Sequence, residues 1–345
     1  EAGGGVFASS ASSVVVSSGA RVDVIDNTAV ALYGGGLYLQ NSNTRLDVSG
    51  TGTRLVVQGN SAGQYGGGVY ATLASSVVVS SGARVDVVDN TAVTSYGGGL
   101  YLVSQDTLLD ISGSGTRLVV QGNSAGQTGG GVFAVSASSV VVSLGARVDV
   151  IDNTAVTYYG GGLYLVSQDT LLDISGSGTR LVVQGNSAGQ KGGGVFAVSA
   201  SSVVVSLGAR VDVIDNTAVA LYGGGLYLEH QDTRLDVSGS GTRLVVQGNS
   251  AGQAGGGVSA QSASSVVVSL GARVDVIDNT AVALYGGGLY LQDPDTRLDV
   301  SGNGTRLVVG GNSAGDDGGG VAGFLASSVV VSLGAHMDVI KNTAV

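Results

Sequence analysis

Few residues of this 345-residue chain have the types and spacing that catalysis requires. Its only two histidines, His230 and His336, occupy unrelated positions, and no Ser/His/Asp arrangement recurs or converges. Carboxylates are numerous, so a polysaccharide lyase, hydrolase or epimerase is the enzyme class to consider. Such an enzyme needs one irregular site made by distinctive loops, whereas every loop here is short and copied along the chain. The sequence therefore predicts that the protein is not an enzyme.

Aspartate recurs at one position of alternate repeats, where it is the candidate ligand for a cation. Calcium takes six to eight oxygen ligands at about 2.3–2.6 Å, and carboxylates two turns apart would be separated by about 9.6 Å. The chain has no cysteine, which excludes disulfides and thiolate metal sites. We predict no cofactor and no metal, with calcium as the weaker alternative. The repeated aspartates are Asp26, Asp89, Asp152, Asp215 and Asp278.

One asparagine occurs in each repeat, directly after an apolar segment and before a small residue. A side-chain amide at such a turn can bond its own backbone or the equivalent amide of the next turn. We expect a structural ladder of asparagines, with contact to a ligand as the alternative. The ladder residues are Asn27, Asn60, Asn90, Asn123, Asn153, Asn186, Asn216, Asn249, Asn279, Asn312 and Asn342.

An aromatic residue also recurs, each time between aliphatic neighbours. If those neighbours point into a core, the rings point outward and form a stripe that can bind sugar rings or another copy of the protein. The opposite orientation would make the rings part of the core. We favour the outward orientation, and lateral assembly over carbohydrate binding. The stripe consists of Phe7, Tyr38, Tyr70, Tyr101, Phe133, Tyr164, Phe196, Tyr227 and Tyr290, and Ser259 and Ala322 interrupt it.

Arginine forms the clearest charged column, and in alternate repeats an aspartate follows two residues later. Exposed ion pairs of this kind contribute at most about 1 kcal/mol each, so we expect mainly a solvated face that discourages edge pairing. A contact face for an acidic partner or a second rod is the alternative. The column consists of Arg21, Arg54, Arg84, Arg117, Arg147, Arg180, Arg210, Arg243, Arg273 and Arg306, and it ends at His336.

These columns exist because the whole chain is a repeat. Triple glycine begins at residues 3, 34, 66, 97, 129, 160, 192, 223, 255, 286 and 318, so spacings of 31 and 32 alternate within a 63-residue unit. Residues 97–127 are identical to 160–190, which indicates internal duplication. We therefore treat residues 1–345 as one array of eleven half-repeats rather than as several domains.

Each half-repeat contains three strand candidates rich in Val, Leu, Ile, Tyr and Thr, separated by Ser-Gly, Asn-Thr and Gly-Gly. No segment has the 3.6-residue apolar period of a helix. Three short strands per ~31 residues favour a parallel β-helix over a propeller, whose blades need four strands and ~40–45 residues. Eleven turns spaced by ~4.8 Å would make a rod roughly 50 Å long. The first strand candidates are residues 6–8, 13–17, 21–25, 37–39, 45–48 and 54–57.

Alternation within the strands predicts which side chains fill the core. Val22 and Val24 should point inward while Arg21 and Asp23 point outward. The glycine triplets should form a corner that needs positive φ or close backbone approach. By the same alternation we expect inward side chains at Val14, Val16, Leu46, Val48, Leu55 and Val57.

The segment Val24-Ile25-Asp26-Asn27, followed by Gly34-Gly35-Gly36-Leu37, resembles the paired FxxN and GGA(I/L/V) repeats of polymorphic outer-membrane proteins, which are autotransporter adhesins. A tetrad of this kind occurs in all eleven half-repeats, with Val in place of Phe and Gly in place of Ala. The resemblance implies a right-handed parallel β-helix at a cell surface, used in adhesion.

The composition limits the classes of partner that the protein can bind. The net charge is −10 and no basic cluster is present, which argues against nucleic acid and anionic membranes. No apolar run is long enough for a membrane span. A chain rich in Ser, Thr, Gly and Asn with few lysines is typical of an extracellular or cell-surface location.

We therefore expect an extracellular fibrous protein, a spike, stalk or filament, whose main partner is itself. Neither end of the sequence has a capping helix, so we expect a window of a longer array or a unit that stacks end to end. The alternative is a cell-surface adhesin that binds carbohydrate or a receptor through the aromatic stripe. A polysaccharide-active β-helix enzyme is the third option.

Overall fold

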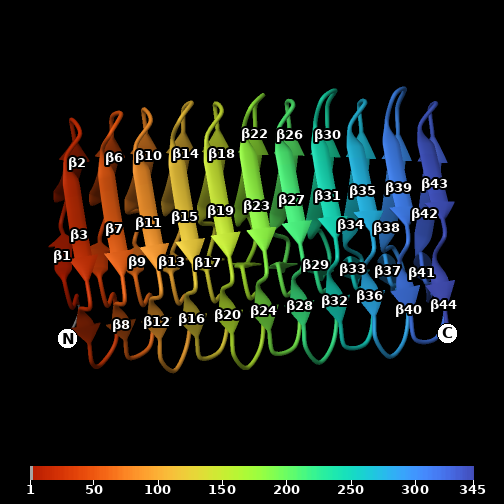
Figure 1. Cartoon of the computed structure of the whole chain (residues 1–345), viewed down its shortest axis with the longest axis horizontal. Helices are drawn as coiled ribbons and strands as arrows, with labels where there is room; N and C mark the ends of the chain where they lie inside the picture. The colour runs from red at the N-terminus through yellow and green to blue at the C-terminus, as the bar shows by residue number, and fades with distance from the viewer. Residues whose placement is uncertain (1–2) are drawn as a thin grey trace.

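The computed structural model describes residues 3–345. The chain coils into eleven turns that stack along one axis, and the strands of each turn pair with those of its neighbours (Figure 1). All pairs are parallel and in the same register, and no residue of the described chain is helical. The predicted all-β parallel solenoid is thereby confirmed. Among residues 3–345 there is accordingly no helix long and apolar enough to cross a membrane.

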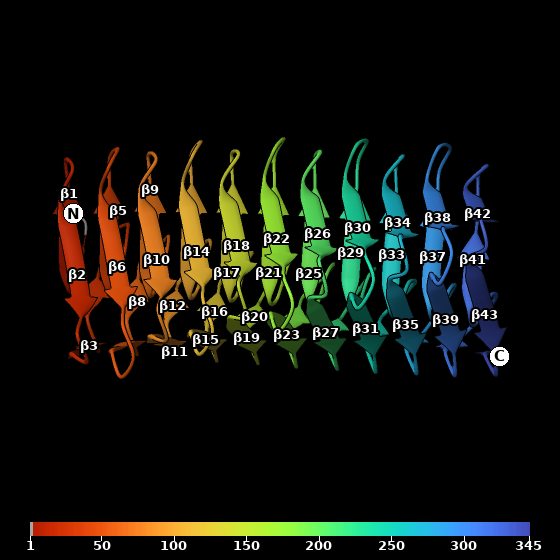
Figure 2. The same cartoon turned by 90° about the horizontal axis from the view of Figure 1, so that it is seen from above.

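Four sheets of eleven strands run along the rod, which corrects the expectation of three strands per turn (Figure 2). The additional strand has only two residues, Thr-Ala or Ser-Ala, and follows each ladder asparagine. It is too short for a period-2 pattern, so the sequence showed only a turn there. We number the sheets 1 to 4 in the order in which each turn of the chain visits them.

Sheet 1 carries the aromatic residues and sheet 2 the serine-rich strands. Sheet 1 contains β1 (Val6–Ser9), β5 (Leu37–Gln40), β9 (Val69–Thr72), β13 (Leu100–Val103), β17 (Val132–Val135), β21 (Leu163–Val166), β25 (Val195–Val198), β29 (Leu226–Glu229), β33 (Val258–Gln261), β37 (Leu289–Gln292) and β41 (Val321–Gly323). Sheet 2 contains β2 (Ser13–Ser17), β6 (Arg45–Ser49), β10 (Ser76–Ser80), β14 (Leu108–Ser112), β18 (Ser139–Ser143), β22 (Leu171–Ser175), β26 (Ser202–Ser206), β30 (Arg234–Ser238), β34 (Ser265–Ser269), β38 (Arg297–Ser301) and β42 (Ser328–Ser332).

Sheet 3 carries the arginine column and sheet 4 the two-residue strands. Sheet 3 contains β3 (Arg21–Ile25), β7 (Arg54–Gln58), β11 (Arg84–Val88), β15 (Arg117–Gln121), β19 (Arg147–Ile151), β23 (Arg180–Gln184), β27 (Arg210–Ile214), β31 (Arg243–Gln247), β35 (Arg273–Ile277), β39 (Arg306–Gly310) and β43 (His336–Ile340). Sheet 4 contains β4 (Thr28–Ala29), β8 (Ser61–Ala62), β12 (Thr91–Ala92), β16 (Ser124–Ala125), β20 (Thr154–Ala155), β24 (Ser187–Ala188), β28 (Thr217–Ala218), β32 (Ser250–Ala251), β36 (Thr280–Ala281), β40 (Ser313–Ala314) and β44 (Thr343–Ala344).

One continuous core of Val, Leu, Ile and Ala fills the inside of the coil. Inward residues come from sheets 1, 2 and 3, and in the inner turns they are almost completely buried, as Val148 and Val150 of β19 illustrate. Val22 of the first turn is more exposed, because only one neighbouring turn covers it. Since each turn contributes only a few aliphatic side chains, its burial depends on the turns on both sides.

The glycine triplets serve both purposes that the sequence suggested. Gly160, the first glycine of its triplet, has a φ of +65°, a conformation that costs L-residues about 1–2 kcal/mol. Gly161 and Gly162 permit close approach instead, since a Cβ on either would lie 2.6 Å from a backbone oxygen of the next turn. The triplet therefore lets the chain turn sharply into sheet 1 while adjacent turns stay in register.

Candidate functional site on the aromatic face

The two histidines lie in different parts of the described chain. His230 lies in the turn between β29 and β30, whereas His336 begins β43 and contacts Asp338 over 2.8 Å. Residues 3–345 contain no group of three or more His, Cys, Asp or Glu side chains arranged to hold a metal ion.

The repeated aspartates, the candidate calcium ligands, each occupy space above a glycine. Asp152 follows β19 with a φ of +54°, and its carboxylate lies where a Cβ on Gly185 of the next turn would have to be. The same relationship joins Asp89 to Gly122. Aspartate and glycine therefore alternate along this column for a steric reason.

The asparagines form one hydrogen-bonded ladder along the whole rod. Asn153 donates from both its backbone N–H and its Nδ2 to Asn186 Oδ1, over 3.0 and 2.9 Å, and its Nδ2 also donates to the Val120 carbonyl over 2.9 Å. Its own Oδ1 accepts two hydrogen bonds from Asn123. The same bonds connect successive asparagines from Asn27 to Asn342. Because these buried amides are fully used inside the rod, they have no group left for a ligand.

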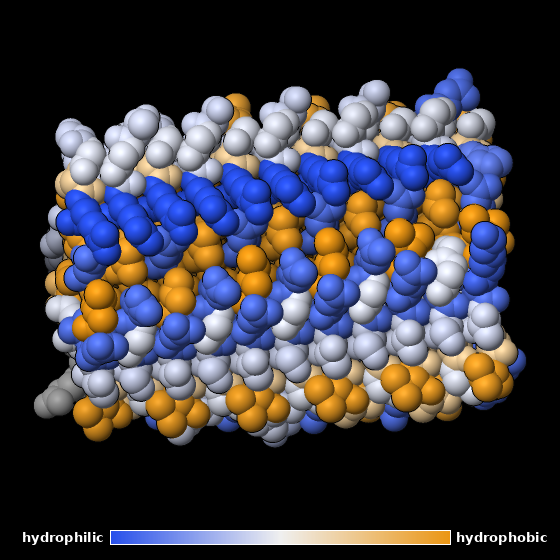
Figure 3. All heavy atoms as spheres, viewed as in Figure 1, coloured by the Kyte–Doolittle hydropathy of each residue, from blue (hydrophilic) through white to orange (hydrophobic). Residues whose placement is uncertain are grey.

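The arginine column differs from the expected row of exposed pairs. Asp149 is fully buried, and it binds the guanidinium of Arg147 on its own strand and that of Arg117 on the preceding turn, over 2.9 and 2.7 Å. Strands about 4.8 Å apart allow two arginines to reach and cover one carboxylate. Figure 3 shows the resulting hydrophilic row along this face. The arginines are half-exposed, in agreement with the expected solvated face. The prediction is wrong for aspartates such as Asp149, which are buried.

The nine aromatic residues of the predicted stripe point away from the core but are not a free surface. Leu100 and Leu102, which flank Tyr101, belong to the main core, whereas the rings form separate clusters outside it. Only Phe7, at 51%, is largely exposed, and Tyr164 is partly exposed. The other seven rings are buried, so the expectation of an exposed stripe is wrong. Neighbouring rings lie close together; the centroids of Tyr101 and Phe133, for example, are 4.8 Å apart.

A second aromatic column covers the first, and the sequence analysis missed it. It is formed by the residue that directly precedes each glycine triplet. Tyr33 and Tyr65 stack with centroids 5.6 Å apart, and Tyr65 lies 5.5 Å from Tyr96. The signal was present, because tyrosine occupies this position before every triplet that begins an even half-repeat. Those tyrosines are Tyr33, Tyr96, Tyr159, Tyr222 and Tyr285.

The residue before the triplet varies strongly in the turns that lie between those tyrosines. In these turns, the position directly before the glycine triplet is occupied by five different residues. By contrast, the sheet 2 strand of alternate turns is Ser-Val-Val-Val-Ser in all six copies. Differences between turns therefore concentrate on the aromatic face. The five residues are Tyr65, Thr128, Lys191, Ala254 and Asp317.

Lys191 shows how a substitution changes this face. Its ammonium lies 4.9 Å from the centre of the Tyr227 ring, within 6 Å of two further tyrosine rings, and 3.0 Å from Glu229. A cation over aromatic faces is favourable by about 0.5–2 kcal/mol. Lys191 therefore fills its place in the column with its own side chain.

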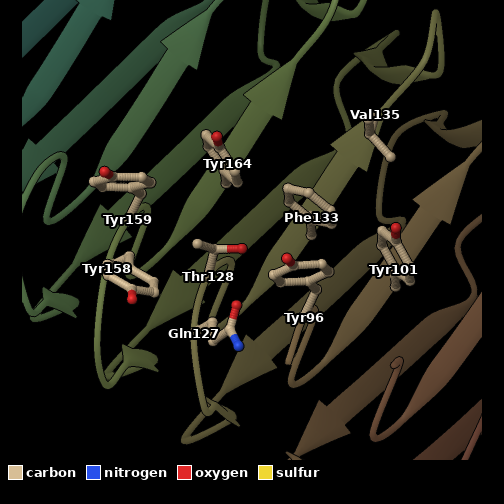
Figure 4. A pocket seen from close by; sticks show the side chains of 9 residues that line it. All are labelled: Tyr96, Tyr101, Gln127, Thr128, Phe133, Val135, Tyr158, Tyr159 and Tyr164. Atoms are coloured by element: carbon tan, nitrogen blue, oxygen red, sulfur yellow. The ribbon is translucent and has the colours of Figure 1, made fainter. Parts of the chain in front are cut away.

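The side chain of Thr128 is too small to fill its position in the outer aromatic column. A pocket of about 400 Å³ lies over Thr128, between Tyr96 of the preceding turn and Tyr159 of the following one (Figure 4). Phe133 of β17 lines it, with its ring 5.3 Å from Tyr96 and 4.9 Å from Tyr164. The Thr128 hydroxyl is buried, has no hydrogen-bond partner and points into the space between Tyr96 and Phe133. This buried hydroxyl without a partner is an exception to the rule that buried polar groups are hydrogen-bonded.

Burial favours the neutral form of several tyrosines on this face. Burial, and then the nearby Tyr222, raise the pKa of Tyr290 to about 12. Burial raises the pKa of Tyr101 and of Tyr164 still further. These three side chains therefore offer hydroxyl groups and no phenolate charge at neutral pH.

No family model and no curated protein matches the chain. Among solved structures, the chain is similar to the crystal structure of the TibC-catalyzed hyper-glycosylated TibA55-350 fragment. The two are 16% identical, the match covers 96% of this chain and 100% of the fragment, and the TM-score is 0.23.

Proposed function

We propose that the protein is an extracellular structural rod, a surface spike, stalk or fibre, that holds one patterned face at a defined spacing. The observation that carries this proposal is the unbroken register of four parallel sheets through all eleven described turns. A side chain on any turn has an equivalent on the next, about 4.8 Å away. Such regularity suits a protein whose function is length and stiffness.

The internal bonding supports the same role. Asparagine amides run through every turn, and on sheet 3 a buried aspartate joins arginines of adjacent turns. Each turn is thereby tied to its neighbours by side chains as well as by the backbone. The tetrads and glycine triplets that resemble the repeats of polymorphic outer-membrane proteins support a location at a cell surface.

Exposed leucines support lateral association between copies of this rod. Leu144 and Leu207 are 71% and 72% exposed, and Leu270 and Leu333 continue the row at 71% and 78%. The leucines recur every second turn, about 9.6 Å apart, so the rows of two copies match in period. Earlier turns have Ser18 and Ser81 at this position, which provides a natural replacement residue.

The rod is tested by deleting residues 97–159, which joins Tyr96 to Gly160 and recreates the Tyr-Gly-Gly-Gly-Leu sequence found at both sites. Small-angle scattering should show a rod shortened by two turns, or about 9.6 Å. Unchanged dimensions, or a compact globular profile, would contradict the rod.

Self-assembly is tested by electron microscopy of the purified protein at several concentrations. Long uniform rods or bundles support the filament, and replacing Leu144, Leu207 and Leu270 by serine should reduce bundling. Isolated rods of roughly 50 Å at every concentration would contradict self-assembly and favour the second candidate.

That second candidate is an adhesin that binds carbohydrate or a receptor through the aromatic face. The concentration of differences between turns on this face favours it, because a scaffold alone needs no such variation. Purified protein applied to a glycan array tests it. Binding should be lost when the exposed part of the outer column is removed by Tyr96→Ala together with Tyr159→Ala.

A further inference from the structure

We propose that the pocket over Thr128 is a binding site for one uncharged pyranose ring, held between Tyr96 and Tyr159. The sugar site rests on the second candidate function above and gives it a position and a ligand class. It is independent of the rod, whose test is length.

The chain itself contains the comparison that defines the shape of the pocket. One 63-residue unit earlier, Tyr65 occupies the position of Thr128, and its ring lies 5.6 Å from Tyr33, 5.5 Å from Tyr96 and 5.6 Å from Tyr101. Threonine supplies no ring, so the place of one aromatic ring stays open between the tyrosines on either side. Those tyrosines are two turns apart, about 9.6 Å along the rod. The opening is therefore shaped for a single flat ring stacked on both sides.

The polar groups decide what kind of ring fits. Gln127 presents a side-chain amide at the lining of the pocket, whereas the Thr128 hydroxyl is covered by the surrounding side chains. Burial raises the pKa of Tyr101 and Tyr164, so nearby phenols stay neutral and can donate or accept hydrogen bonds. A pyranose has an apolar C–H face for the aromatic rings and hydroxyls at its edge for these groups.

The lining also determines the charge of the ligand. No residue that lines the pocket is Asp, Glu, His, Lys or Arg. A charged ring would be desolvated there without a partner, which is costly. Neutral sugars are therefore favoured over uronic or sialic acids.

Two other places along the outer column, at Lys191 and Ala254, are filled. Lys191 occupies the corresponding place with its own side chain, which bonds Glu229 and the Tyr227 hydroxyl. Ala254 is fully buried, and Tyr222 lies 6.1 Å from Tyr290 of the turn beyond it. The geometry thus points to one sugar site within the described turns, at Thr128.

The test uses ligand-observed saturation-transfer NMR on the full chain. The probes are the methyl glycosides of glucose, galactose, mannose and N-acetylglucosamine, with glucuronic acid as the charged comparison and p-cresol as the aromatic one. At least one neutral glycoside should receive saturation, most strongly at the C–H groups of one ring face, and glucuronic acid should receive none.

Two variants separate shape from hydrogen bonding. Thr128→Tyr restores the ring found at Tyr65 and should abolish the signal. Gln127→Leu removes the side-chain amide at the pocket lining, and it should weaken the affinity by about tenfold, the effect expected for one hydrogen bond. The matched control is Gln190→Leu, at the equivalent position one 63-residue unit later and outside the pocket lining. Binding by this control should be unchanged.

Several outcomes would overturn the sugar site. These are no signal from any neutral glycoside, a signal from p-cresol alone, equal binding by Gln127→Leu and the parent protein, or a dimer that Thr128→Tyr dissociates. Scattering from the same samples reports rod length. A rod of normal length that binds no glycoside therefore removes the sugar site and leaves the structural proposal standing.

Discussion

Asn153 Nδ2 donates to Asn186 Oδ1 over 2.9 Å, and the backbone N–H of Asn153 donates to the same oxygen over 3.0 Å. One carbonyl oxygen thus holds both the side chain and the backbone of the turn before it. Since the relationship recurs on every turn, the ladder couples adjacent turns at the point where the chain leaves sheet 3.

Replacing Asn153 by valine should destabilise the rod strongly, because it leaves the Asn123 N–H and the Val120 carbonyl buried without their partners. Several unsatisfied groups at about 1–3 kcal/mol each predict a loss of about 3 kcal/mol or more. Chemical denaturation followed by circular dichroism measures it. Gln184→Ala, on an exposed side chain of the next turn, is the control and should change stability by less than about 0.5 kcal/mol. Equal effects of the two substitutions would show that the ladder contributes nothing.

Removing a buried aspartate should cost less stability than removing the two arginines that bind it. Asp149→Val should stay within about 1 kcal/mol of the parent, since Val119 and Val182 already occupy this position on the adjacent turns and half-exposed arginines remain solvated. Removing Arg117 and Arg147 together instead strands a buried carboxylate, at a cost of about 3–5 kcal/mol.

Denaturation of both variants at the same salt concentration tests this order. If Asp149→Val were the more damaging of the two, the carboxylate would be a structural requirement rather than a tolerated charge.

Two glycines of one turn should respond very differently to alanine. A Cβ on Gly161 would lie 2.6 Å from the Gly193 carbonyl oxygen and overlap Ser187, so Gly161→Ala should cost about 3 kcal/mol or more. Gly178 has a φ of +80° but its nearest neighbour would be 3.7 Å away, so Gly178→Ala adds only backbone strain of about 1–2 kcal/mol. Thermal melts of both variants give the comparison. A result in the reverse order would contradict the close stacking of the glycine corner.

The tyrosine face predicts loss of stability at high pH. Burial raises the pKa of Tyr290 to about 12, whereas tyrosines of the unfolded chain ionise near 10. The unfolded state therefore loses protons first, so the stabilisation is complete below pH 10 and declines as the pH rises toward 12.

Free energies of unfolding from pH 8 to 12 test this decline. Tyr101→Phe with Tyr164→Phe should flatten it, because phenylalanine keeps the ring and cannot ionise. A pH-independent stability in the parent protein would contradict the burial of these hydroxyls.

The sequence by itself determined the features that depend on spacing along the chain. The glycine triplets predicted eleven turns, alternation predicted that Val24, Val48 and Val57 point inward, and the single asparagine per turn predicted a ladder. These features follow from local geometry, because a repeated turn places equivalent residues above one another whatever the details of its path.

The tertiary structure decided which columns lie side by side and what they cover. Thr28–Ala29 forms a strand only because the equivalent segment Ser61–Ala62 lies against it, and Asp149 is buried only because arginines of two turns reach it. The path through the glycine corner brings Tyr96 over Tyr101 and Phe133, which buries the predicted stripe and opens the pocket at Thr128. Contacts between columns depend on how sharply each corner bends, and a one-dimensional period carries no information about that angle.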